Sequence, residues 1–175
     1  MVIGMYGLGR FGSFWAGVLA QEFTVKAYSR DASRPCPPAV ERVTEDGLLS
    51  SSDTLILCVS ISAMEEVLSR ISGRLRKGTL VMDTCSVKVL PAEQMIRILP
   101  AETEIIATHP MFGPDSGKSG VRGLPLVFCP VRASSAASAA WMDRFSSLGL
   151  SVMEMSPEEH DREAAYTQGV THFIG

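Results

Sequence analysis

The sequence lacks the features that mark membrane, secreted or nucleic-acid-binding proteins. Its longest strongly apolar run, residues 55–59, is far too short to cross a bilayer. The N-terminus has no charged leader, and Gly4, Gly7 and Gly9 interrupt any signal-like stretch. A net charge of −3 at pH 7 gives no basic excess that would favour nucleic acid. From these absences we expect a cytoplasmic protein with no membrane or nucleic-acid partner.

Residues that bind metals or form disulfides are also scarce. The four cysteines contain no Cys-x-x-Cys pair, and Cys58 and Cys129 fall inside apolar segments, which favours buried free thiols. The three histidines have no metal-ligand spacing and no neighbouring cysteines, so we expect no metal site. The Gly-x-Ser-x-Gly turn of many hydrolases is missing as well, which argues against covalent hydrolysis.

What is present is a regular alternation of strand-like and helix-like segments. The 175 residues, 46% of them hydrophobic, suffice for one ordinary domain or one domain plus a fragment. The pattern predicts strands over 2–6, 24–28, 40–43, 54–59, 79–82, 105–108, 125–131 and 150–155, and helices over 13–21, 62–72, 88–99, 134–148 and from 157 onward. Such alternation predicts an α/β fold: a Rossmann-type doubly wound, mostly parallel sheet with helices on both faces.

Two helix starts carry a capping-box pattern, a serine followed three residues later by a glutamate. Ser62 and Glu65 have this spacing, so we expect a helix to begin at Ser62. Ser156 and Glu159 repeat it, and Pro157 suits the first helical position, so a second helix is expected there, still running at the last residue.

A glycine motif follows the first predicted strand and opens the first predicted helix. It reads Gly7-Leu8-Gly9-Arg10-Phe11-Gly12. In this context Gly7 permits a tight turn, Gly9 lets the backbone approach a pyrophosphate, and Gly12 lets the helix pack on the strand. The free N–H groups of the helix would hold the phosphates. We therefore predict that these six residues bind a dinucleotide, the alternative being a glycine turn in a non-binding domain.

The end of the second strand bears on the choice between NAD and NADP. An NAD site needs a carboxylate there for the ribose 2′-hydroxyl, whereas Ser29 and Arg30 suit a 2′-phosphate. Asp31 keeps NAD open if it turns inward, but we favour NADP. Three residues at later strand tips complete the expected cofactor set: Val59, Ser60 and Asp83.

His109 is the strongest candidate for acid–base chemistry. Pro110 disfavours the helical conformation at His109 and is expected to end the strand over 105–108, so the histidine lies at a strand tip, where ligands bind in α/β folds. Ser86, just past another strand tip, is either a plain helix cap or a donor to a histidine or to the nicotinamide. His160, beside Asp161, is expected to be structural or surface.

Four blocks together resemble the prephenate and arogenate dehydrogenases of tyrosine biosynthesis, and the resemblance covers nearly the whole chain. Besides the glycine motif, three blocks carry it: Asp83-Thr84-Cys85-Ser86-Val87-Lys88, His109-Pro110-Met111-Phe112-Gly113-Pro114, and Glu159-His160-Asp161 followed by residues 168–173. The resemblance implies an NAD(P)-dependent oxidative decarboxylation of prephenate or arogenate, giving 4-hydroxyphenylpyruvate or tyrosine.

The resemblance also assigns roles. His109 would take the proton of the ring hydroxyl as hydride leaves, an unperturbed imidazole being neutral at cellular pH, and Ser86 would orient it. His172, Gln168, Gly113 and Asp115 would line the substrate pocket. Residues 1–155 would form the dinucleotide-binding domain.

Residues 156–175 would begin a truncated helical domain for substrate and homodimer contacts. We therefore expect this chain alone to bind cofactor and to turn over substrate poorly. Two alternatives stay open at this point: another nicotinamide-dependent dehydrogenase or reductase, or a non-catalytic dinucleotide-binding module.

Overall fold

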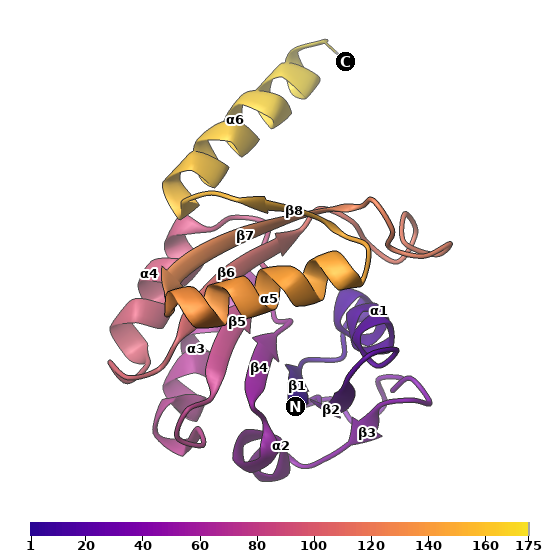
Figure 1. The fold of residues 1–175 in the computed structure, drawn as a ribbon, viewed down its shortest axis with the longest axis vertical. Coiled ribbons are helices and arrows are strands. Elements are labelled where there is room, and N and C mark those ends of the chain that lie inside the picture. The colour runs from indigo at the N-terminus through magenta and orange to yellow at the C-terminus, as the bar shows by residue number, and fades with distance from the viewer. Residues whose placement is uncertain (175) are drawn as a thin grey trace.

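The computed structural model describes the backbone of residues 1–174 and the side chains of residues 1–166. Its centre is one eight-stranded sheet with the strand order β3-β2-β1-β4-β5-β6-β7-β8 (Figure 1). The strands are β1 (Val2–Tyr6), β2 (Thr24–Tyr28), β3 (Glu41–Arg42), β4 (Thr54–Leu57), β5 (Leu80–Asp83), β6 (Ile105–Pro110), β7 (Pro125–Arg132) and β8 (Ser151–Glu154).

Helices cover both faces of this sheet. They are α1 (Arg10–Leu19), α2 (Glu45–Ser51), α3 (Ile61–Ile71), α4 (Val89–Ile98), α5 (Ser135–Ser147) and α6 (Pro157–Ile174). One buried cluster joins the sheet to α1 and α5 through Trp15 and Phe145, and a second joins it to α2, α3 and α4. Alternate residues of β1 serve the two clusters, as Met5 packs on one side and Tyr6 on the other.

Every strand pair is parallel except β6–β7, which is antiparallel. The other crossovers contain a helix or a long return, whereas β6 and β7 are joined by a loop without a helix, and that connection allows antiparallel pairing. The predicted Rossmann-type, mostly parallel sheet is therefore confirmed. No described helix is both long and apolar enough to cross a membrane.

Strand β6 runs two residues further than the sequence predicts and includes His109 and Pro110. Its pairing with β5 ends at Ala107, so the tip of β6 pairs only with β7, where Pro110 lies opposite Leu126. A strand tip with one partner tolerates a residue that has no N–H to donate. The histidine is thus part of the strand end itself and not of the following loop.

Several helix starts differ from the prediction. Helix α1 begins at Arg10, inside the glycine motif, and α3 begins at Ile61 with Ser60 at its N-cap, so Ser62 lies in the first turn and caps nothing. Helix α2 was not predicted, although Thr44 caps it by accepting a hydrogen bond from the Gly47 N–H.

At the start of α6 the predicted capping box is formed. Ser156 N–H donates to Glu159 Oε2 at 2.9 Å, and Glu159 N–H donates to Ser156 Oγ at 3.1 Å. This reciprocal pair fixes the residue at which α6 begins, and with it the place of His160 one turn later.

Candidate functional site

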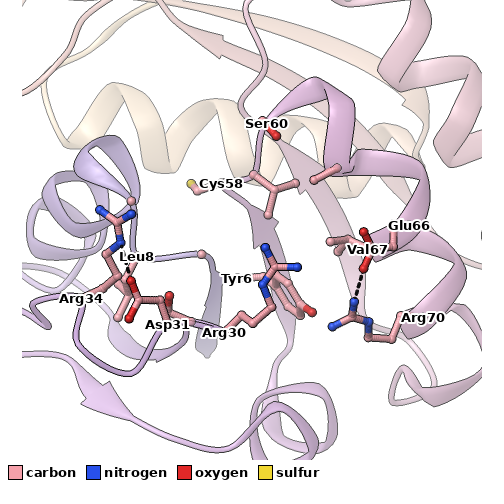
Figure 2. A pocket seen from close by; sticks show the side chains of 15 residues that line it. Tyr6, Leu8, Arg30, Asp31, Arg34, Cys58, Ser60, Glu66, Val67 and Arg70 are labelled. Carbon is pink, nitrogen blue, oxygen red and sulfur yellow. Dashed lines mark hydrogen bonds and ion pairs between the residues drawn. The ribbon is translucent and has the colours of Figure 1, made fainter.

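The glycine motif lies where the strand order reverses, between β1 and β4, the position at which doubly wound sheets bind ligands beyond their carboxyl ends. A pocket of about 310 Å³ opens there (Figure 2). Its walls come from the ends of β1, β2 and β4 and from α3: Tyr6, Gly7, Leu8, Gly9, Ser29, Arg30, Asp31, Arg34, Cys58, Val59, Ser60, Ala63, Glu66, Val67 and Arg70.

Each motif glycine has its own reason to lack a side chain. Gly7 has a φ of +107°, and a Cβ there would lie 2.4 Å from the Cys58 carbonyl oxygen. A Cβ on Gly12 would lie 2.0 Å from the Gly7 carbonyl oxygen, so Gly12 seats α1 against the turn. Apart from its two chain neighbours, a Cβ on Gly9 would meet no atom of the described residues within 4 Å. The space beside Gly9 is therefore open on the pocket side, as close approach of a phosphate requires.

The N-terminus of α1 is suited to an anion. Gly9 is its N-cap, no side chain caps it, and its first turn contains no acidic residue. The first N–H groups of the helix are therefore free to bind phosphate oxygens, and the helix dipole adds a partial positive charge. Together with the open space at Gly9, these groups fit a dinucleotide pyrophosphate.

The far end of the pocket bears cationic side chains. Asp31 is already engaged, because it accepts hydrogen bonds from the Ser33 N–H at 3.0 Å and Ser33 Oγ at 2.6 Å and lies 3.2 Å from Arg34 Nε. The bonds from Ser33, aided by Arg34, hold the pKa of Asp31 below its ordinary value. Arg30 has no hydrogen bond or ion pair to any described side chain. Its guanidinium lies between the Asp31–Arg34 pair and the α3 residues Glu66 and Arg70 (Figure 2).

Not every predicted cofactor residue lines this pocket. Phe11 instead packs on Phe112 at 6.4 Å between ring centroids, and Gly12 is buried behind the turn. Leu8 reaches the pocket, but its side chain is 1% exposed and belongs to the core. Arg10 is exposed and turns to the loop after β6, where it donates to both oxygens of Asp115 at 2.7 and 2.6 Å.

Asp83 lies away from the pocket and forms a buried ion pair with Lys88, both side chains being 0% exposed. Lys88 Nζ also donates to the Thr108 carbonyl oxygen at 2.6 Å, and Asp83 Oδ1 accepts from the Thr108 N–H at 3.3 Å. A fully buried pair of this kind requires close geometry and further hydrogen bonds. Here it holds the backbone immediately before His109.

The α3 wall of the pocket was not predicted from the sequence. Ala63, Glu66, Val67 and Arg70 follow the β4 tip at helical spacing and face the glycine turn. Their spacing of three and four residues was visible, but it equally fits a helix packed on the sheet. Which face of that helix meets the pocket depends on the fold and not on local sequence.

A second candidate centre surrounds His109 at the tip of β6. Because β4, β5 and β6 run parallel, this tip lies at the same sheet edge as the glycine turn. His109 Nδ1 lies 2.9 Å from His160 Nε2, and His160 Nδ1 lies 2.7 Å from Asp161 Oδ1. His160, expected to be structural or surface, is 4% exposed and contacts the candidate base directly.

A small cavity of about 160 Å³ lies beside the two histidines. Its other walls are mainly apolar, and its lining is His109, Met111, Val127, Met153, Met155, His160, Glu163 and Ala164. Partial burial in this setting, together with the nearby His160 and Lys88, lowers the pKa of His109 to about 4, against the opposing charge of Asp161. His109 is therefore neutral at cellular pH and able to accept a proton.

The remaining predicted site residues are less closely placed. Ser86 is exposed, and no described hydrogen bond joins it to His109, whose Nδ1 is occupied by His160. Gly113 lies in the loop after β6, where its N–H donates to Ser116 Oγ at 3.0 Å. The side chains of His172 and Gln168 lie outside the described residues. Among the described residues, no group of three or more His, Cys, Asp or Glu side chains could hold a metal ion.

The low pKa of His109 can be measured without substrate. We expect its imidazole to stay neutral as the pH falls from 7 and to protonate only near pH 4, instead of near the ordinary 6.5. Desolvation and two neighbouring basic side chains oppose the charged form, so the direction of the shift is downward. NMR titration of the imidazole nitrogens gives the value directly. A midpoint at or above 6.5 would contradict the environment described here.

Taken together, the glycine turn at the β1/β4 switch point, the open α1 N-terminus and the pocket define a dinucleotide-binding domain of the Rossmann type. Residues 24–141 match the family described as "Prephenate dehydrogenase, nucleotide-binding domain", and the chain belongs to that family.

The relatives agree with this family. The chain is 38% identical to arogenate dehydrogenase 2 and 36% identical to arogenate dehydrogenase 1, both chloroplastic proteins of Arabidopsis thaliana, with 99% of the chain aligned in each case. It spans only 51% and 29% of their respective lengths. The crystal structure of Synechocystis arogenate dehydrogenase superposes with a TM-score of 0.79 at 23% identity, covering 95% of this chain and 64% of that one, which shows a shared fold.

Proposed function

We propose that the chain is the cofactor-binding and proton-accepting part of an NADP-dependent dehydrogenase that oxidatively decarboxylates prephenate or arogenate. One observation carries the proposal: a neutral imidazole, anchored through Nδ1, ends a strand at the same sheet edge as a dinucleotide pocket. Family membership and the named activities of the two Arabidopsis relatives support the choice of substrate.

NADP⁺, when bound, would accept the hydride on its nicotinamide ring. His109 would accept a hydrogen bond from the ring hydroxyl of the substrate and take its proton as the carbon beneath loses hydride. The carboxylate on the opposite ring carbon would leave as carbon dioxide, and the electrons of the broken bond would complete the aromatic ring and pass to the ring oxygen. His109 would then return its proton to that oxygen, which gives the neutral phenol. Proton acceptance of this kind contributes about 10²–10⁴-fold to a rate. Ser86 stays a proposed donor near the nicotinamide end, and Gly113, Asp115, Gln168 and His172 stay proposed substrate contacts.

NADP is favoured over NAD by the state of the charged side chains at the β2 end. The carboxylate that would bind a ribose 2′-hydroxyl, Asp31, is held by Ser33 and Arg34. Arg30 has no described partner and lies in the same pocket, next to Ser29. A guanidinium and a hydroxyl complement a phosphate, so a 2′-phosphate would engage groups that are otherwise unpaired.

Replacing Arg30 by alanine is expected to weaken NADPH binding by about tenfold to a hundredfold, the loss of one charge-assisted contact of about 1.5–3 kcal/mol. NADH, which has no 2′-phosphate, should bind about as well as before. Titration of both reduced cofactors by fluorescence measures the ratio. Arg76→Ala, which removes an arginine bound to Asp53 away from this pocket, is the matched control. Equal losses for NADH and NADPH would defeat the assignment of Arg30.

The proposed function as a whole is tested by two measurements on the same preparation. Fluorescence titration reports whether NADPH binds, and NADPH formation in the presence of prephenate or of arogenate reports turnover. Binding together with turnover of either acid supports the proposal. Binding with no turnover, even in single-turnover experiments at high protein concentration, would favour the non-catalytic module instead.

We infer further that α6 opens a second, helical unit that completes the substrate site and forms the homodimer. Figure 1 shows α6 projecting away from the sheet. Its described residues are mostly charged or exposed, apart from His160 at its base. Residues 1–155 would then be the dinucleotide-binding domain, and residues from 156 onward would belong to the second unit.

A further inference from the structure

A His–Asp pair, with His160 buried and Asp161 partly exposed, lies directly behind His109, and the reaction proposed above does not by itself account for it. His160 and Asp161 are the fourth and fifth residues of α6, whereas His109 is the last residue but one of β6 and lies 51 residues before His160. His160 makes two ring contacts, to His109 Nδ1 at 2.9 Å and to Asp161 Oδ1 at 2.7 Å. Both ring nitrogens of His160 are thus used, one on each side.

Asp161 is restricted to accepting hydrogen bonds. Its Oδ1 accepts from the Lys88 N–H at 2.7 Å, and its Oδ2 accepts from the Val89 N–H at 3.0 Å, both at the start of α4. Burial works to raise the pKa of Asp161, but the bonds from Val89, His160 and Lys88 outweigh it and hold that pKa below its ordinary value. An ionised carboxylate has no proton to give. The proton between Asp161 and His160 must therefore lie on His160 Nδ1.

The position of the proton on His160 determines the position of the proton on His109. A neutral imidazole has one N–H and one bare nitrogen, so a neutral His160 with a proton on Nδ1 has a bare Nε2. That bare nitrogen can only accept, which means that His109 Nδ1 must donate to it across the 2.9 Å contact. A neutral His109 with its proton on Nδ1 then has a bare Nε2.

We propose that His160 and Asp161 are positioning residues that fix the tautomer of His109, so that Nε2 is the nitrogen presented as the base. The inference rests on the proposed role of His109 and adds to it the source of its orientation. It also replaces Ser86 with His160 as the residue that orients the imidazole through Nδ1.

The backbone around this pair supports a fixed geometry. Asp161 is bonded to the start of α4, and the side chain of Lys88, the residue before that helix, is bonded to the Thr108 carbonyl and to Asp83. The chain of contacts therefore closes on itself: from His109 through His160 and Asp161 to Lys88, and from Lys88 back to the residue before His109. A ring of bonds that includes fully buried groups leaves little freedom to the imidazole.

The arrangement also has a use during reaction. When Nε2 takes a proton, His109 becomes a cation whose Nδ1–H still points at His160. The hydrogen-bonded chain that ends at the Asp161 carboxylate stabilises this positive charge, and no second proton transfer is required. A base in the wrong tautomer would present an N–H to the substrate hydroxyl and could not accept its proton. In a related His–Asp arrangement the wrong tautomer lowers kcat by up to about 10⁴-fold.

The first test is spectroscopic and needs neither substrate nor cofactor. With ¹⁵N-labelled histidine at pH 7, we expect His109 to show a protonated Nδ1 and a bare Nε2, and His160 to show the same tautomer. Because no turnover is measured, this result is independent of whether the chain is a dehydrogenase. A His109 with its proton on Nε2, or in rapid exchange between tautomers, would overturn the proposal.

The second test compares two substitutions of His160. Glutamine has a side-chain oxygen that can accept from His109 Nδ1–H, whereas leucine fills the space and accepts nothing. We expect His160→Leu to mix the two His109 tautomers and to lower kcat by at least about tenfold with KM little changed. His160→Gln should retain most of the native tautomer and recover part of kcat.

A merely structural role for His160 would give a different result. Both variants would then lower the melting temperature alike and leave the His109 tautomer as in the wild type wherever the protein is folded. The tautomer measurement on the unsubstituted chain stays decisive even if His160→Leu fails to fold.

Discussion

His109→Asn is expected to cut turnover of prephenate or arogenate by about 10²–10⁴-fold, the usual contribution of a positioned base. Asparagine is close in size and keeps a polar group beside His160, but its amide has no basic nitrogen. Its position at the tip of β6 lies outside the walls of the dinucleotide pocket, so affinity for NADPH should change little. The measurements are kcat from NADPH formation and Kd from fluorescence titration.

A matched control separates lost chemistry from lost fold. Ile96→Ala removes an exposed apolar side chain from α4, away from both candidate centres, and should leave kcat and Kd near the wild-type values. If His109→Asn instead turned over substrate like the wild type, the imidazole would have no role as base, and the site around it would need another explanation.

The low pKa of His109 bears on how this base would act. A base with a pKa of about 4 is fully available at neutral pH but has only a weak affinity for protons. Substrate binding changes that balance, because a carboxylate brought near the imidazole favours its cationic form and raises its pKa. We therefore interpret the depressed value as a property of the free protein, in which burial, His160 and Lys88 act without an opposing ligand charge.

Much of the fold was predictable because its signals are local. Residues 2–6 and 24–28 form strands at the predicted bounds, since short apolar runs bounded by glycine or polar turns are typical of buried strands. The glycine motif was equally recognisable from its spacing, because Gly7 makes the turn with a positive φ and Gly12 packs on the Gly7 carbonyl five residues earlier; the contact of Gly7 with Cys58 is long-range. The capping box at Ser156 formed because both of its partners lie within one turn.

The candidate site was predictable only in part, because its contacts are long-range. The sequence indicated His109 through its place before Pro110, but its partner His160 lies 51 residues away and becomes a neighbour only when α6 packs against the end of β6. Lys88 was predicted only as the first residue of a helix, yet it is fully buried. Its burial depends on Asp83 and Thr108 offering partners from two different strands.

Gly12→Ala is expected to lower the stability of the fold, whereas Gly9→Ala is expected to weaken cofactor binding, although the two glycines lie three residues apart in the same motif. At Gly12 the new Cβ would meet the Gly7 carbonyl oxygen at 2.0 Å and Cys58 Cβ at 3.1 Å, and backbone cannot yield as a flexible side chain can. Overpacking of this kind typically lowers the free energy of unfolding by about 1–3 kcal/mol, and a clash with backbone places Gly12→Ala at the upper end. We expect a markedly lower midpoint of denaturation, with cofactor binding weakened as a consequence.

At Gly9 the new Cβ would meet no described atom within 4 Å beyond its chain neighbours, and the φ of −67° is one that alanine adopts freely. The loss of a favourable N-cap residue and the gain from a less flexible unfolded chain oppose each other, so stability should stay within about 1 kcal/mol. The methyl group would instead occupy the space that a phosphate needs. We expect it to weaken NADPH binding by about tenfold or more, which corresponds to at least about 1.4 kcal/mol. Denaturant titration and cofactor titration of both variants therefore give a crossed pattern. If Gly9→Ala bound NADPH like the wild type, the pyrophosphate would lie elsewhere, because the open space beside Gly9 is the feature that places it there.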